Sequence, residues 1–236
     1  MRQVLAAVEE VGAQPTDFMF LLFLLFFAIA EAQYCYFIPP PNWEIAQLKN
    51  PSPHVKIGFI GKGSTTFRPS INLATEEIDV SLKEYVKAVK ELQLADPTTK
   101  WRDLGKFPME GGTGRLTEMS TSSPWGELQV FQAFLVKEGT VYILTAAILK
   151  EDLPKFHAPL LSSFRSLTFI DDLWTPIADS QRRSEFQALF TSLGTEEGKW
   201  EKLQSCVSAL AELGPYWQFL ALQEGRVRMT SVEKSK

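Results

Sequence analysis

Apolar and polar residues alternate along three stretches in the first half of the chain. These stretches cover residues 43–45, 55–60 and 70–78. Apolar side chains at every second position share one face of a strand and can be buried together. The pattern therefore predicts three strands.

The stretch KIGFIGKGSTTFRP, residues 56–69, has the glycines and the lysine of a phosphate-binding loop but lacks its spacing. A P-loop needs a glycine, four residues, and then Gly-Lys-Ser/Thr. Here Lys56 stands five positions before Gly61, and Gly63 follows Lys62. The dinucleotide-binding spacing fails as well, because a threonine occupies the position of its third glycine. The stretch instead predicts a strand that ends in a glycine turn.

A helix is predicted after residue 81, because apolar residues then recur at intervals of three and four. Ser81 and Glu84 have the form of a capping box, in which each satisfies the other's backbone amide. Asp96-Pro97 ends the element. The buried face would carry Leu82, Tyr85, Val86, Val89 and Leu92.

Strand-like segments follow in close succession up to residue 149. They cover residues 104–109, 114–121 and 126–149, the last being two strands joined by a turn at Glu138-Gly139. The connections are too short for parallel crossovers, so the sheet should be mainly antiparallel. The last strand is apolar almost throughout, which predicts a central position.

A helix over residues 151–167, with Pro159 expected to perturb its middle, follows this block. The order of elements predicts an α+β fold, with a mainly antiparallel sheet flanked by helices in an α/β/α layered arrangement. We expect this domain to span residues 33–170.

Helical periodicity returns in residues 171–236, predicted to be a helical extension with a polar tail. One helix is expected over residues 180–193, and another opens near Thr195 and breaks at Gly214-Pro215. A short apolar helical turn follows at residues 216–222, and the polar residues 224–236 should fray.

Large aromatic residues stand out in this extension, namely Trp200, Tyr216, Trp217 and Phe219. Such residues dominate interfaces, so they are candidates for a partner-binding surface. The alternative, which we favour, is that they pack the extension onto the main domain, since an amphipathic helix must bury its apolar stripe.

Thirteen consecutive apolar residues, 18–30, lie near the start of the chain. A membrane-spanning helix needs about 20, so this is the length of a signal-peptide core. Ala30-Glu31-Ala32 has the small-x-small form of a cleavage site, which predicts a signal peptide over residues 1–32, cleavage after Ala32 and Gln33 as the first mature residue. The alternative is an uncleaved membrane anchor. The acidic stretch before the apolar core is atypical of a signal, which leaves open whether Met1 or Met19 is the start.

The chain has 236 residues and a formal net charge of −4, which gives no indication of a nucleic-acid surface. Its two cysteines, Cys35 and Cys206, could form one disulfide in an oxidising compartment. The alternative is two unpaired thiols.

Motifs for catalysis or metal binding are not found in the sequence. The two histidines, His54 and His157, lie far apart and neither has ligand spacing around it. No Gly-x-Ser-x-Gly nucleophile motif occurs. We therefore expect no catalytic residue, no metal and no cofactor.

Residues 37–169 resemble the PsbP-like superfamily, which includes PsbP, the Ran-binding Mog protein and bacterial DcrB-type envelope proteins. The resemblance is carried by IPPPNWEI, INLATEEIDVSLKEYVKAVKEL, the hairpin GELQVFQAFLVKEGTVYILTAAIL and the closing FHAPLLSSFRSLTF. It implies an antiparallel sheet between helical layers and a mostly non-enzymatic binding or assembly role. The helices after residue 175 depart from the family pattern.

Together these features predict an exported, non-catalytic binding or assembly module of the bacterial envelope, periplasmic or secreted, with an unknown protein partner. It would meet the membrane only during export. One alternative is a small-ligand carrier or an unrecognised enzyme, with a pocket between sheet and helices. Another is a membrane-anchored protein that faces the periplasm and keeps residues 18–30.

Overall fold

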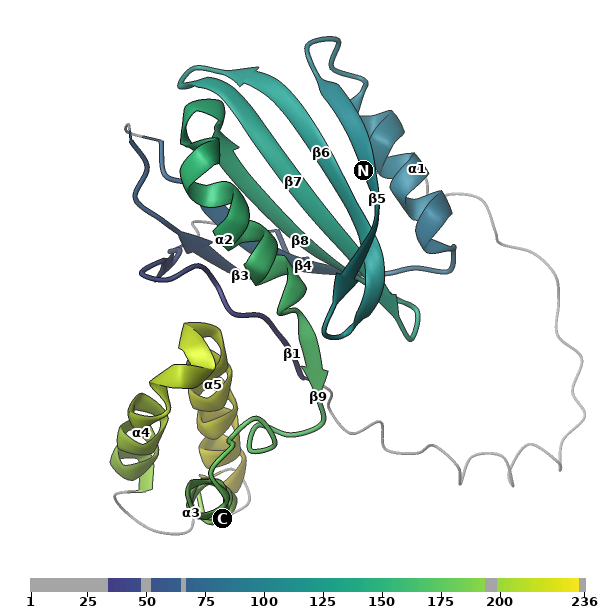
Figure 1. The fold of residues 1–236 in the computed structure, drawn as a ribbon. Coiled ribbons are helices and arrows are strands. Elements are labelled where there is room, and N and C mark those ends of the chain that lie inside the picture. The colour runs from purple at the N-terminus through teal and green to yellow at the C-terminus, as the bar shows by residue number, and fades with distance from the viewer. Residues whose placement is uncertain (1–33, 48–51, 65–66, 194–198, 234–236) are drawn as a thin grey trace, which may run out of the picture. The chain divides into compact units, whose positions relative to one another are not determined.

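A seven-stranded antiparallel sheet forms the centre of the fold in the computed structural model, which describes residues 34–47, 52–64, 67–193 and 199–233 (Figure 1). The strand order is β2-β3-β4-β8-β7-β6-β5. The strands are β2 (Glu44–Ile45), β3 (Val55–Ile60), β4 (Ser70–Glu77), β5 (Lys100–Met109), β6 (Gly112–Ser123), β7 (Gly126–Lys137) and β8 (Thr140–Leu149). The predicted α+β class is confirmed, and β8 is central as its apolar sequence indicated.

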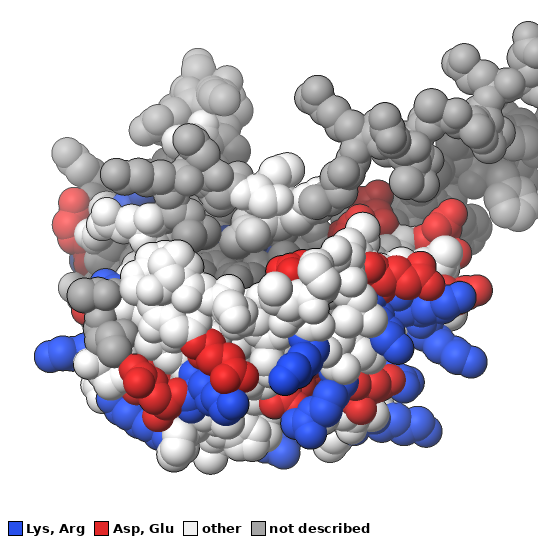
Figure 2. All heavy atoms as spheres, turned by 90° about the horizontal axis from the view of Figure 1, so that it is seen from above, with Lys and Arg blue, Asp and Glu red and all other residues white. Residues whose placement is uncertain are grey.

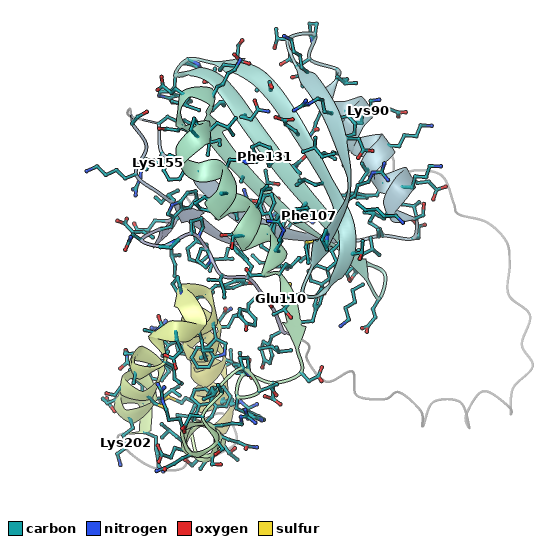
Figure 3. All side chains as sticks on the ribbon, in the orientation of Figure 1. Lys90, Phe107, Glu110, Phe131, Lys155 and Lys202 are labelled. Atoms are coloured by element: carbon teal, nitrogen blue, oxygen red, sulfur yellow. The ribbon has the colours of Figure 1, made fainter. Side chains whose placement is uncertain are left out.

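The sheet carries a helix on each face, as Figure 1 shows, because β7 is apolar on both of its faces. Phe131 and Leu135 belong to the core that also holds residues of α2 (Leu153–Arg165). Phe134, which points the other way, packs in a separate cluster with Val86 of α1 (Leu82–Gln93). Figure 3 shows Phe131 and Phe107 inside the fold under α2. Lys90 of α1 points toward β5, with its Nζ 5.2 Å from the ring centroid of Trp101.

Local signals in the sequence fix several element ends. The capping box of α1 is present, because the Glu84 amide donates to the Ser81 hydroxyl and the Ser81 amide donates to the Glu84 carboxylate. The β7–β8 hairpin turns at Glu138 and Gly139, whose φ angles of 51° and 75° suit a two-residue turn. Pro159 lies inside α2 without interrupting it.

The glycine-rich stretch after β3 docks against the start of α2. A Cβ on Gly61 would clash with the ring of Trp43, so only glycine permits this close approach. The Ser64 amide donates to a carboxylate oxygen of Asp152 at 3.2 Å. This amide is therefore bound to a carboxylate of the protein itself.

A small two-stranded sheet was not predicted. β1 (Tyr34–Tyr36) pairs antiparallel with β9 (Thr168–Ile170), and Cys35 lies opposite Phe169. The pairing brings the first described residues of the chain next to the segment that follows α2.

The C-terminal helices have a hydrophobic core of their own. They are α3 (Ser180–Thr191), α4 (Lys199–Ala209) and α5 (Gly214–Glu233), and both cores belong to one compact unit. Gly214, with φ 83°, separates α5 from the turn before it, as predicted. The predicted opening of α4 near Thr195 lies outside the described residues. The domain boundary near residue 170 stays a prediction.

One prediction for the C-terminus is wrong. Residues after 223 were expected to fray, but α5 continues to Glu233. Two contacts stabilise this part of the helix. Gly225 lies close to Leu203 of α4, and Glu224 forms an ion pair with Arg228 one turn later. Tertiary packing therefore outweighs the polar composition of the segment.

Candidate functional site

A pocket of about 340 Å³ lies between the sheet and α5, near β1. It is lined by Tyr34 and Cys35 of β1, Lys56 of β3, Leu73 and Thr75 of β4, Thr140 and Tyr142 of β8, and Tyr216, Phe219, Leu220 and Gln223 of α5. The volume is at the lower end of the range of about 300–1,000 Å³ that is typical of small-molecule sites.

The register of β4 and β8 explains why the pocket forms at this end of the sheet. Leu73 lies opposite Leu144, and the next pair on the same face is Thr75 with Tyr142. Side chains two residues apart share a face, so hydroxyl groups continue the row that leucines begin in the core. The pocket therefore has an apolar part and a polar part.

A β-bulge sets the place of Lys56. The register between β3 and β4 shifts there, so that Val55 faces Ala74, Ile57 faces Leu73 and Lys56 has no opposite residue. A bulge breaks the alternation of side chains and re-aims the extra residue. Lys56 lines the pocket although its neighbour Ile57 is buried in the core.

Tyr216 belongs to α5 but packs in the sheet core. Its ring makes edge contacts with Phe37 and Phe59, at centroid distances of 5.5 Å and 6.2 Å, and the residue is only 4% exposed. Its hydroxyl group has no hydrogen-bond partner among the described residues. Burial raises the pKa of this phenol well above its usual value, so it remains a hydrogen-bond donor at neutral pH.

The other phenols and the thiol of the pocket have raised pKa values as well. Burial raises the pKa of the Tyr142 and Tyr34 phenols. Cys35 and Glu138 raise that of Tyr142 further, and Glu224 raises that of Tyr34 while Arg228 opposes it. Burial also raises the pKa of the Cys35 thiol strongly, and Lys137 opposes this only in part. Since the thiolate is the reactive form of cysteine, this thiol is a poor nucleophile.

Among the residues that the sequence singled out, Cys35, Tyr216 and Phe219 come together in this pocket. Trp217 is completely buried in the helical core, where its indole Nε1 donates to the Leu173 carbonyl oxygen at 3.0 Å. Trp200 is half-buried, with the Arg226 guanidinium 5.4 Å from its ring centroid. Two of the four aromatic residues, Tyr216 and Trp217, are therefore inside the protein.

The two cysteines are free in this structure. Cys35 packs against the core of the sheet, and Cys206 packs against the core of the C-terminal helices. The predicted cleavage site at Ala32 and Gln33 lies outside the described residues.

Sequence reasoning did not find Lys56, Thr75, Tyr142 or Gln223. One signal was available, because Thr75 and Tyr142 continue the buried faces of their strands with hydroxyl groups in place of leucine. The bulge at Lys56 and the seating of α5 depend on contacts between distant segments, and local patterns do not encode them.

A second hollow, of about 440 Å³, lies between α1 and the strands β5 and β6. Its charged groups are largely used within the protein. Arg115 pairs with Asp103 across the two strands, and Glu84 is part of the cap of α1. Acidic and basic side chains are also interspersed on the face in Figure 2, which gives no region of a single charge there.

No group of three or more His, Cys, Asp or Glu side chains within the described ranges could hold a metal ion. In the same part of the chain, no helix is long and apolar enough to cross a membrane.

No protein-family model matches the sequence, and no curated protein matches it. Among solved structures, the chain is similar to LpqN of Mycobacterium tuberculosis, which is described as involved in cell envelope biogenesis. The identity is 13% and the TM-score is 0.47, and the match covers 61% of this chain and 87% of LpqN. It is similar to PsbP of Synechocystis sp. PCC 6803, with 12% identity, a TM-score of 0.41 and coverage of 61% and 95%. It is also similar to the Ran-binding protein Mog1p of Saccharomyces cerevisiae, with 18% identity, a TM-score of 0.39 and coverage of 56% and 88%.

These structures share the PsbP-like fold, and they include PsbP and the Mog protein, both of which belong to the superfamily that residues 37–169 resemble. With identities of 12–18% and TM-scores below 0.5, the likeness gives no information on the ligand, the partner or the compartment of this chain.

Proposed function

We propose that this protein is an exported, non-catalytic binding module of the bacterial cell envelope, and that it holds a small ligand in the pocket between the sheet and α5. The main support is Tyr216, a residue 96% buried whose hydroxyl group has no partner among the described residues and which lines the pocket. The Tyr216 ring is buried but its hydroxyl group stays accessible, so a polar ligand group in the pocket can accept its hydrogen bond.

The chemistry of the lining favours binding over catalysis. General acid–base catalysis near neutral pH needs a group with a pKa near 7, most often histidine or a carboxylate. The described residues that line the pocket include no His, Asp or Glu, and burial raises the pKa of the Cys35 thiol and of the phenols. These groups can donate hydrogen bonds to a ligand without exchanging protons with it.

Native mass spectrometry of the full chain, purified from cells that produce it, tests the binding. We expect part of the protein to carry a small non-covalent molecule that unfolding releases. Thr75→Phe should fill the pocket and abolish this adduct. Thr113→Phe, at an exposed position of β6 outside the pocket, should keep it. A ligand-free mass for the parent chain, or an adduct that Thr75→Phe leaves unchanged, would refute the proposal.

The proposal that the protein is exported rests on the apolar segment at residues 18–30 and on the Ala30-Glu31-Ala32 sequence that follows. Intact mass and peptide mapping after cell fractionation should show Gln33 as the first residue, in the soluble envelope fraction. A native chain that retains residues 18–30 would contradict cleavage. The unknown envelope partner remains a prediction, and pull-down experiments with the mature chain that recover no specific protein would count against it.

A further inference from the structure

Lys56 is the only charged residue among those that line the pocket in the described part of the chain. The bulge in β3 puts it there, out of the regular alternation of the strand. A lysine ammonium group has three donors and no acceptor, so it selects for an acceptor and most strongly for an anion.

Three phenol groups contribute further donors. Tyr34, Tyr142 and Tyr216 all line the pocket, and none of their hydroxyl groups has a hydrogen-bond partner among the described residues. Burial raises the pKa of each phenol, which keeps the proton in place. Protonated phenols donate well to an oxyanion.

Carboxylates nearby affect the tyrosines from outside the pocket. Beside the effect of burial, Glu224 and Asp172 raise the pKa of Tyr34 while Arg228 lowers it. Cys35 and then Glu138 raise the pKa of Tyr142. None of the three carboxylates lines the pocket. The direct surroundings of a ligand would therefore be one cation and several neutral donors.

The remaining lining combines the polar side chains of Thr75, Thr140 and Gln223 with an apolar part. Leu73 is buried, and Phe219 and Leu220 are half-buried on the pocket side of α5. A ligand that fills about 340 Å³ must cover these side chains as well as meet the donors.

We propose that the pocket binds a small organic anion with an apolar body, whose oxyanion lies against Lys56 and the phenols and whose body lies against Leu73, Phe219 and Leu220. This inference deepens the proposed function and rests on it. It concerns the class of ligand, namely a carboxylate or sulfonate on a ring or a short chain.

Two dyes with nearly the same ring system test the class of ligand. Anilinonaphthalene sulfonate carries an anion on an apolar body, and phenylnaphthylamine has the body without the anion. Fluorescence titration of the folded full chain should show that the sulfonate binds about tenfold tighter or more, as a charge-assisted hydrogen bond would give.

Matched variants then assign the preference to the pocket. Lys56→Gln should remove the preference for the sulfonate, Lys56→Arg should keep it, and Tyr216→Phe should weaken sulfonate binding about threefold or more. Lys87→Gln removes the same charge from the exposed side of α1, on the other face of the sheet, and should leave both affinities unchanged. Circular dichroism confirms beforehand that each variant is folded.

The outcomes separate this inference from the proposed function. Equal affinity for the two dyes, or a preference that survives Lys56→Gln, would overturn the anion class while leaving the pocket as a binding site. If neither dye binds, the anion inference falls, and a ligand-free native mass would then overturn the proposed function too.

Discussion

Trp217 links α5 to the segment before α3, and its replacement by phenylalanine should destabilise the helical core. The side chain is completely buried, and its ring centroid lies 5.4 Å from that of Phe186. Its indole Nε1 donates to the Leu173 carbonyl oxygen at 3.0 Å. Trp217→Phe keeps a six-membered aromatic ring but removes the donor and part of the ring system.

The expected magnitude has two parts. A buried carbonyl group left without its donor costs about 1–3 kcal/mol. Two lost ring carbons cost about 0.8 kcal/mol each if they resemble buried methylene groups. The free energy of unfolding should therefore fall by roughly 3–5 kcal/mol, a large share of the 5–15 kcal/mol or so that is typical of natural domains.

Urea unfolding followed by far-ultraviolet circular dichroism measures this change without relying on tryptophan fluorescence. Trp200→Phe is the matched control, because Trp200 is half-buried and its recorded partner is the Arg226 guanidinium, which a phenylalanine ring can still face. We expect the control to cost less than about 1 kcal/mol. If the free energies of unfolding of the two variants agree within about 0.5 kcal/mol, the stabilisation assigned to the buried hydrogen bond of Trp217 is too large.

Three further predictions concern the sheet, the cap of α1 and the cysteines. A Cβ at Gly114 would overlap a carbonyl oxygen of β7, so Gly114→Ala should cost about 2 kcal/mol or more in urea unfolding, while Gly58→Ala, which meets only ordinary contacts, should stay within about 1 kcal/mol of the parent. Ser81→Ala removes the cap of α1 and should cost about 1 kcal/mol in the same assay, and no loss would show that the cap is unimportant. Burial raises the pKa of Cys35 more than that of Cys206, so iodoacetamide should modify Cys206 first in a native time course read by mass spectrometry. The opposite order would mean that β1 opens in solution.

The features that could be predicted from the sequence are those that depend on near neighbours. The capping box at Ser81 and the turn at Glu138-Gly139 each need only a few adjacent residues, and the structure confirms both. The central place of β8 follows from its apolar sequence, since a strand covered on both faces cannot alternate. The α+β class then follows from the order of the elements.

The features that were missed depend on contacts between distant residues. The β1–β9 pair joins Tyr36 to Thr168, and nothing local to either segment indicates a partner. The length of α5 was underestimated because composition was used for a segment that Leu203 of another helix stabilises. The pocket could not be predicted for the same reason. It forms only where the bulge at Lys56 and the packing of α5 against the sheet occur together.

The pocket also depends on a local property of α5. Successive residues of a helix point about 100° apart. Tyr216 therefore packs in the core of the sheet, while its neighbour Trp217 packs in the core of the C-terminal helices. Since the pocket takes residues from the sheet and from α5, it exists only while Tyr216 remains seated between Phe37 and Phe59. A ligand that binds this state alone must stabilise the seating by RT ln(1 + [L]/Kd). In the proposed function, the C-terminal helices are therefore part of the binding site, and their attachment to the sheet and the occupancy of the pocket are thermodynamically linked.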